Sequence, residues 1–102
     1  MLLCKQILTG TLVGGTKSWT TDKFSGKELI QFTVVPTSQY TNVYDITIVD
    51  FESDPIVNYV GVEGVLVRNE RIPLQGVYTV LISNATIAEA VRVIMRVGES
   101  GD

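Results

Sequence analysis

Hydrophobic residues recur at every second position along much of this chain, which is the spacing typical of β-strands. The clearest case is residues 44–51, where Tyr44, Ile46 and Ile48 point to one side and the residues between them point to the other. Valine, isoleucine and threonine are frequent throughout, and their branched β-carbons suit a pleated sheet. The pattern therefore predicts a protein built mainly of β-strands.

Five strands are expected from this alternation and from the glycines and prolines that interrupt it. They cover residues 4–13, 29–35, 44–51, 62–68 and 77–83. The polar residues 16–27 are expected to form either a hairpin tip or a frayed extension of a strand. Residues 69–76 are expected to form the hairpin-like connection between the last two strands.

Two segments carry helix signals instead. In the first, Ser53 or Asp54 can cap a helix, Pro55 suits a first helical position and Gly61 can end it after about two turns.

The second helix signal lies at the end of the chain. Thr86 and Glu89 fit a capping box, and the apolar residues of 87–97 share one helical face before Gly98. Apolar residues and arginine also alternate at 91–96, so a continued fifth strand is the competing interpretation.

The order of three strands, a short helix and two strands is that of the OB-fold, a five-stranded barrel that binds oligonucleotides. We therefore expect an all-β protein with an OB-fold barrel in residues 1–85. A C-terminal helix and a short tail are expected in residues 86–102.

Composition narrows the chemistry that this domain can perform. The chain has 102 residues, enough for a single domain, and it contains no histidine and one cysteine, Cys4. It therefore lacks the commonest general base and cannot build a structural zinc site. Asp50, Glu52 and Asp54 lack the glycine and final glutamate of a calcium loop, so we expect them to form a solvated turn. We expect no catalysis, metal or cofactor.

Short apolar runs and the absence of a secretory signal pattern predict no membrane span and no export. The single cysteine fits a reducing compartment, so a cytoplasmic protein is expected.

The aromatic residues have basic neighbours where the sequence is polar. The net charge is −3, but residues 1–43 carry +2 and residues 44–102 carry −5. Aromatic rings beside loops can stack on the bases of a single strand, at about 1–3 kcal/mol each, while lysines follow the phosphates. The aromatic residues in such positions are Trp19, Phe24, Tyr40 and Tyr44, and the accompanying lysines are Lys17, Lys23 and Lys27.

Other aromatic residues are expected to pack inside the protein. Phe32 lies between Ile30 and Val34, Tyr78 shares its side with Val80 and Ile82, and Tyr59 lies on the short helix. For Trp19 and Tyr40, a place in the core or in a subunit interface is the alternative to ligand contact.

Five segments in order carry a family resemblance, which covers roughly residues 5–85. They are Ile7-Leu8-Thr9-Gly10-Thr11-Leu12, Gly26-Lys27 with Phe32 to Tyr40, Thr47-Ile48-Val49-Asp50-Phe51, Val62-Glu63-Gly64-Val65-Leu66 and Val77 to Ile82. The chain resembles the OB-fold single-stranded-DNA-binding proteins of bacteria and phages, in a compact phage-like version. The resemblance implies base-stacking roles for Tyr40 and Phe51. The family's acidic tail with a final phenylalanine is missing.

The leading hypothesis is a protein that binds single-stranded DNA in replication or recombination, together with replication or recombination proteins. The residues expected to contact DNA are Lys17, Trp19, Lys23, Phe24, Lys27, Tyr40, Phe51, Arg68 and Arg71. The mean hydropathy of +0.26 favours a homo-oligomer, either dimer or tetramer. The alternative is an OB-fold protein-interaction or structural assembly module that binds no nucleic acid.

Overall fold

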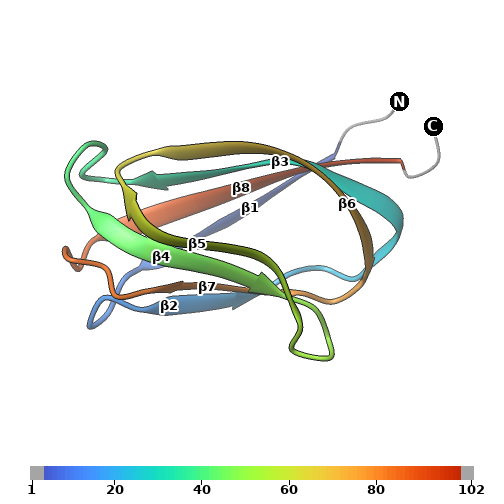
Figure 1. Ribbon diagram of the computed structural model, residues 1–102, viewed down its shortest axis with the longest axis horizontal. Helices are drawn as coiled ribbons and strands as arrows, with labels where there is room; N and C mark the ends of the chain where they lie inside the picture. Colours follow the sequence, from blue (N-terminus) through green and yellow to red (C-terminus); the bar gives the residue numbers. More distant parts are fainter. Residues whose placement is uncertain (1–3, 100–102) are drawn as a thin grey trace.

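The computed structural model describes residues 4–99, which form eight β-strands and no helix (Figure 1). The strands are β1 (Cys4–Thr11), β2 (Lys17–Thr20), β3 (Phe24–Pro36), β4 (Val43–Val49), β5 (Pro55–Glu63), β6 (Leu66–Gly76), β7 (Thr79–Ser83) and β8 (Ala90–Glu99). They make two antiparallel four-stranded sheets with the orders β1-β8-β3-β6 and β2-β7-β4-β5. The two sheets pack face to face as a sandwich.

The connectivity is that of a long hairpin that has been rolled up. β1 pairs with β8, β2 with β7, β3 with β6 and β4 with β5, so the second half of the chain runs back along the first. Successive pairs fall into alternate sheets, which is the arrangement of an eight-stranded jelly roll. The loops 12–16, 37–42, 64–65 and 84–89 consequently meet at one end of the sandwich, and the loops 21–23, 50–54 and 77–78 lie at the other end.

The predicted OB-fold barrel is therefore wrong, and so is the family resemblance that rested on it. Residues 4–99 form two separate sheets with no closed barrel. The sequence interpretation counted five strands because it assigned β2 to a hairpin tip or strand extension and assigned β5 and β8 to helices. Residues 69–76, expected as a connection, extend β6 as an edge strand, where Pro73 costs no ladder hydrogen bond on its outer side. The polar segment 16–27 supplies β2 and the start of β3.

The helix predicted after Ser53 is a strand, β5. Its residues Ile56, Val57 and Val60 are β-branched, and such side chains favour the sheet over the helix. The supposed capping residue Ser53 lies in a tight turn with a φ of 65°, and Gly61 has a φ of 69° at an irregularity in the pairing of β5 with β4. The start and stop signals were real features of turns and bulges, and they did not enclose a helix.

The C-terminal helix predicted over residues 87–97 is wrong, because residues 90–99 form a strand, β8. This strand is also not a continuation of the predicted fifth strand, since β7 and β8 lie in different sheets. β8 lies between β1 and β3 and pairs with both along most of its length. Val91, Val93, Met95 and Val97 alternate into the core, where they are almost completely buried. This alternate-side burial needs a period of two, and a central strand gains a ladder of hydrogen bonds on each side. Residues 90–99 thus belong to the sandwich itself.

The hydrophobic core lies between the inner faces of the two sheets, and here the alternation pattern was a good guide. Tyr44, Ile46 and Ile48 are at most 1% exposed, as their shared side predicted. Phe32 is completely buried as expected, and Tyr78 packs with Val80 and Ile82 in the same core cluster. Burial of such side chains stabilises the sandwich by about 25 cal/mol for each Å² of apolar surface removed from water.

Candidate interaction surface

The outer surface of the β1-β8-β3-β6 sheet carries basic and aliphatic side chains in adjoining rows. In one row, the antiparallel pairing places Ile7 beside Ile94, Ile94 beside Thr33 and Thr33 beside Val67. In the next rows, Lys5 pairs with Arg96, and Thr9 pairs with Arg92. We call this surface the basic face; its residues are Lys5, Ile7, Thr9, Gln31, Thr33, Val35, Val67, Asn69, Arg92, Ile94 and Arg96.

Burial shows that these side chains point away from the core. On β8, Val93 and Met95 pack in the hydrophobic core between the sheets. Ile94 lies between them in the sequence and is only 9% exposed, but it does not pack in that core. Ile94 is therefore covered by neighbours on the outer surface. Ile7 and Val67, in the same row, are 48% and 52% exposed. The centre of the basic face is an aliphatic strip that is open to solvent at both ends.

The charges of the basic face are all positive, and Glu28, which also lies on the outer surface of this sheet, is neutralised by its ion pair with Arg71. Lys5, Arg92 and Arg96 give it +3. Arg96 donates from Nη1 to the Gln31 side chain at 2.9 Å, and Gln31 donates from Nε2 to Asn69 at 2.9 Å, so a hydrogen-bonded row crosses the sheet from β8 to β6. The row fixes the position of the Arg96 guanidinium beside Gln31.

Arg92 is exposed and is not part of that row. The two ion pairs within residues 4–99 join Lys27 to Glu99 and Arg71 to Glu28, each at 2.9 Å, so the guanidinium of Arg92 is not neutralised by a carboxylate of the described chain. A cation left without a partner on a surface is available to an incoming anionic group.

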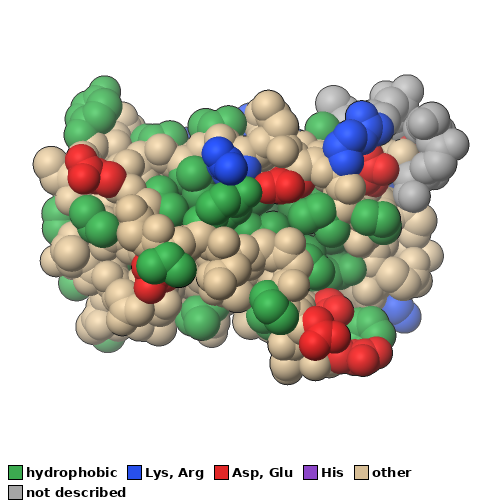
Figure 2. All heavy atoms as spheres, in the orientation of Figure 1, with side chains coloured by type: hydrophobic (Ala, Val, Ile, Leu, Met, Phe, Trp, Pro, Cys, Tyr) green, Lys and Arg blue, Asp and Glu red, His purple; other side chains and the backbone are tan. Residues whose placement is uncertain are grey.

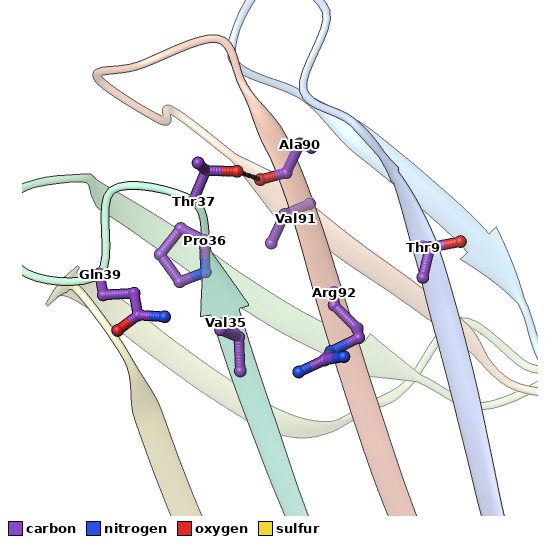
Figure 3. Close-up of a pocket in the computed structure, with 8 residues that line it drawn as sticks. All are labelled: Thr9, Val35, Pro36, Thr37, Gln39, Ala90, Val91 and Arg92. Carbon is purple, nitrogen blue, oxygen red and sulfur yellow. Dashed lines mark hydrogen bonds between the residues drawn. The ribbon is translucent and has the colours of Figure 1, made fainter.

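A shallow cavity of about 350 Å³ opens on the basic face next to Arg92 (Figure 3). Its lining residues are Thr9, Val35, Pro36, Thr37, Gln39, Ala90, Val91 and Arg92. Thr37 caps the upper edge by donating from Oγ1 to the Ala90 carbonyl at 2.9 Å, and its backbone N–H donates to the same oxygen at 3.1 Å. The cavity therefore combines an apolar wall, a polar rim and one cation.

The loop end beside this cavity is nearly free of charge. Across the loops 12–16, 37–42, 64–65 and 84–89, Glu89 is the one side chain that carries a charge at neutral pH. Its carboxylate accepts hydrogen bonds from the Ser38 N–H at 2.8 Å, the Ser38 hydroxyl at 2.7 Å and Asn42 Nδ2 at 2.9 Å. Burial alone would raise the pKa of Glu89, but these hydrogen bonds outweigh it and hold the pKa below the ordinary value. Glu89 fastens two loops together and positions the cavity wall.

Asn42 completes this fastening. It is completely buried, and its amide donates to the Ile87 carbonyl at 3.1 Å and accepts from the Ile87 N–H at 3.3 Å. The backbone carbonyl of Asn42 accepts a hydrogen bond from the backbone N–H of Gly64 at 2.8 Å. Glu89 and Thr86 matched a helix-capping box in the sequence, but Thr86 Oγ1 accepts from the Val43 N–H at 3.0 Å instead. The two residues therefore hold loops together across the sandwich.

The opposite end of the sandwich carries an acidic loop. Residues 50–54 include three carboxylates, and Phe51 among them is 69% exposed. This loop stands out from the body, and acidic side chains gather on it at the lower right of the molecule (Figure 2). Asp50 Oδ1 accepts from the N–H groups of Glu52 at 2.9 Å and Asp54 at 3.0 Å, which fixes the shape of the loop. The loop is the solvated turn that the sequence predicted, although it enters a strand rather than a helix.

The aromatic residues predicted to stack on DNA do not gather in one groove. Trp19 is half-buried and donates from Nε1 to the Thr9 carbonyl at 3.0 Å, and Phe24 lies in the core at 8% exposure beside Tyr78. Tyr40 is 81% exposed in the loop 37–42, whereas Phe51 lies at the other end of β4. The two exposed rings are thus separated by the whole length of a strand.

The predicted cationic residues are also dispersed. Lys27 and Arg71 are engaged in the ion pairs with Glu99 and Glu28, and Arg68 lies 4.7 Å from the centre of the Tyr59 ring. Lys23 is exposed in the loop 21–23, and Lys17 lies beside Gly10 at the start of β2. The nine predicted contact residues share no single surface.

The residues of the basic face escaped the sequence interpretation because 87–97 was assigned to a helix. On the predicted helix, Arg92 and Arg96 point to solvent, away from the apolar face, so they were not connected with any surface of the sheet. The alternation of arginine and isoleucine at 92–96 was the signal that could have placed them, since alternate residues of a strand share a face. Lys5, Ile7 and Thr9 have the same alternation in β1 and pair with that segment.

Two further features bear on the chemistry of the described residues. Within residues 4–99, no three histidine, cysteine, aspartate or glutamate side chains lie close enough together to hold a metal ion. The same part of the chain contains no helix that could span a membrane.

Comparison with known proteins supports the fold alone. No protein-family model matches the chain, and no curated protein sequence is significantly similar to it. Among solved structures, the pre-peptidase C-terminal domain of a Bacillus anthracis collagenase superposes with a TM-score of 0.58 at 14% identity, covering 89% of this chain and 87% of that one.

Two other structures are more distant. The core of the Drosophila protein NLP gives a TM-score of 0.47 at 12% identity, covering 94% of this chain and 99% of that one. A mitogen from Yersinia pseudotuberculosis gives 0.49 at 11% identity, covering 99% and 90%. The collagenase domain, at 14% identity, supports similarity of the fold and not of function, so the chain is similar in fold to a β-sandwich domain.

Proposed function

We propose that this chain is a non-catalytic structural module that self-assembles through its basic face. The observation that carries the proposal is the concentration of charge on that surface. The basic face holds +3, and the net charge of the whole chain is −3, so the remainder of each molecule carries −6. Two copies can therefore bring a positive surface against a negative one without any other partner.

The composition of the basic face also suits a protein partner. Interfaces are enriched in arginine and in apolar side chains at their centre, with polar groups around them. The basic face has the aliphatic strip of Ile7, Ile94 and Val67 at its centre, with Arg92 and Arg96 beside it. No aromatic ring belongs to this surface among the described residues, although stacking rings would be expected of a single-strand DNA site. The geometry favours assembly over DNA binding. DNA binding stays a prediction, and the OB-fold resemblance that first suggested it is wrong.

Multi-angle light scattering over a range of protein concentrations tests the proposal. We expect the apparent mass of the wild-type chain to rise with concentration at low salt and to fall towards that of a monomer at high salt, because the contacts are partly ionic. The double substitution Arg92→Glu and Arg96→Glu should leave the chain monomeric. Lys23→Glu, an exposed cation outside the basic face, is the matched control and should assemble like the wild type.

A second experiment measures the fluorescence anisotropy of a labelled oligo-dT, to test whether the basic face binds single-stranded DNA instead. Trp19 is half-buried and hydrogen-bonded, so its own fluorescence would report poorly on a ligand. A wild-type chain that stays monomeric at every concentration would contradict the proposal. Oligo-dT binding at low salt that is abolished by Arg92→Glu and Arg96→Glu would also overturn it, because the basic face would then be a nucleic-acid surface.

A further inference from the structure

We infer that the acidic loop 50–54 of one copy docks into the cavity beside Arg92 of another, so that Phe51 enters the cavity and copies join head to tail. This inference rests on the proposed function and names the element of the second copy that meets the basic face. The loop and the cavity lie at opposite ends of the sandwich, so a copy cannot fill its own cavity (Figure 1).

Charge complementarity singles out this loop as the occupant. Three of its five residues are carboxylates, the densest run of negative charge in the chain. Asp50 is occupied in shaping the loop, which leaves the side chains of Glu52 and Asp54 exposed for contact. Arg92 is the cation at the cavity and has no carboxylate partner in its own described chain. A carboxylate and a guanidinium can form two parallel hydrogen bonds.

The shapes of the two elements agree as well. Phe51 rests with one edge over Gly76, where an added β-carbon would lie 3.3 Å from the ring, and the other side of the ring is open to solvent. A cavity of about 150 Å³ is enough to hold a benzene ring. The cavity of about 350 Å³ on the basic face therefore has room for the phenylalanine ring against Val35 and Pro36. An aromatic side chain in a pocket is the usual energetic centre of an interface.

The rigidity of the loop lowers the cost of docking. The backbone N–H of Asp50 donates to the Asp54 carbonyl at 2.9 Å, and the N–H of Ser53 donates to the Asp50 carbonyl at 3.0 Å. A loop held in one shape before binding loses little conformational entropy on binding. One loop in one shallow cavity buries less surface than a permanent interface, so the association should be weak and reversible.

A head-to-tail contact has a consequence that a symmetric contact lacks. The two surfaces that meet are different, so each copy offers one free loop and one free cavity, and assembly continues into a ring or a filament. A copy with a damaged loop still has an intact cavity, and a copy with a damaged cavity still has an intact loop. A mixture of the two can form pairs and nothing longer.

This property provides the test, which uses sedimentation velocity of the full chain. The loop variant carries Phe51→Ser and Glu52→Gln, and the cavity variant carries Arg92→Glu. We expect each variant alone to associate at least tenfold more weakly than the wild type. An equimolar mixture of the two should form a species of two chains and no larger one. Asp22→Lys, which reverses an exposed carboxylate at the same end as the loop, should assemble like the wild type.

Other outcomes of this experiment show whether the head-to-tail contact, the proposed function or both are wrong. If the loop variant associates like the wild type while the cavity variant does not, the basic face is an interface but the loop is not its partner, so this inference fails and the proposed function stands. A mixture that remains monomeric also overturns the head-to-tail contact. A wild-type chain that never associates removes the proposed function and this inference together. Circular dichroism and thermal unfolding of each variant show that the fold is retained.

Discussion

At the scale of single residues, a small polar cluster at the loop end holds connections that the core does not reach. Asn42 and Glu89 join the loops 37–42, 64–65 and 84–89 through hydrogen bonds that satisfy the buried amide. Each bond contributes about 0.5–1.5 kcal/mol to stability, but leaving a buried partner without its bond costs about 1–3 kcal/mol. These residues therefore stabilise the fold and also fix the wall of the cavity.

Replacing Asn42 should lower the free energy of unfolding, by an amount that depends on the charge of the new side chain. Asn42→Ala leaves groups of Ile87 and Glu89 unsatisfied, and we expect the free energy of unfolding to fall by about 2–3 kcal/mol. Asn42→Asp puts a carboxylate beside Glu89 and should destabilise the protein further at pH 7, with partial recovery at pH 4 as a proton is taken up. Urea unfolding at both pH values measures the difference. Equal stability of Asn42→Ala and the wild type would refute the role given to this cluster.

The lowered pKa of Glu89 gives a second prediction at this scale. A carboxyl whose pKa is lower in the folded than in the unfolded protein stabilises the fold at pH values above its unfolded pKa, here about 4.5. That contribution is lost as the pH falls through the lower folded-state pKa. We expect the free energy of unfolding to decline more steeply below pH 4.5 in the wild type than in Glu89→Gln. Chemical denaturation from pH 6 to pH 3 compares the two slopes, and identical slopes would count against the assignment.

At the scale of elements, the strands are explained by their β-branched residues and by the burial of every second side chain. The residues that suggested helix caps did not begin helices. In β8, Val91, Val93 and Val97 are buried, whereas Ala90 and Arg92 are exposed. Capping residues such as Thr86 and Glu89 also hydrogen-bond backbone groups in loops, so they mark the end of an element without fixing the type of the next one. A run of β-branched residues after the cap was the more reliable guide.

Val93 distinguishes a strand from a helix experimentally. Its side chain is completely buried in the middle of the central strand β8, so Val93→Ala should lower the free energy of unfolding by about 2 kcal/mol. In a surface helix the same change would be close to neutral, because alanine is the better helix former. Arg92→Ala, on the outer side of the same strand, is the control and should change stability by less than about 0.5 kcal/mol. Thermal or urea unfolding of both variants decides between the two.

The sequence predicted part of the fold and little of the candidate site. The strands around Tyr44, Phe32 and Val80 were found because each buries one side against the core, and burial leaves a period of two in the sequence. The pairing of β1 with β8 joins residues about 90 positions apart, and no local pattern records it. The basic face exists only through that pairing, because it brings Ile7 and Ile94 together. The cavity likewise combines Thr9 with Arg92.

At the scale of the whole molecule, the cation of the cavity and the acidic loop lie at opposite ends of the sandwich, whereas Lys5 and Arg96 of the basic face lie towards the acidic end. Arg92 has no carboxylate partner among residues 4–99, the loop end beside it is nearly uncharged, and the acidic loop 50–54 lies at the far end. Such a separation gives each copy two complementary surfaces that it cannot join to one another. The overall acidic charge counted from the sequence hides this polarity, which appears only when the strands are assembled.

Salt should act on assembly and not on folding. The contacts proposed between copies are partly ionic and lie at the surface, where salt weakens the attraction between charges over a screening length of about 10 Å at 0.1 M, whereas the core is apolar. We expect the association constant to fall at least tenfold between 50 mM and 500 mM salt, while the midpoint of thermal unfolding of the dilute monomer changes little. Light scattering and calorimetry measure the two quantities, and association that strengthens with salt would indicate a purely apolar contact.

Amide chemical shifts recorded as a function of protein concentration show which residues of one copy meet another copy. We expect the shifts that move with concentration to lie on the basic face, around Ile7, Arg92 and Ile94, and in the loop 50–54. Shifts of Thr47 and Leu81, on the outer surface of the β2-β7-β4-β5 sheet, should stay constant. A spectrum that does not change with concentration, or changes confined to that other sheet, would contradict assembly through the basic face.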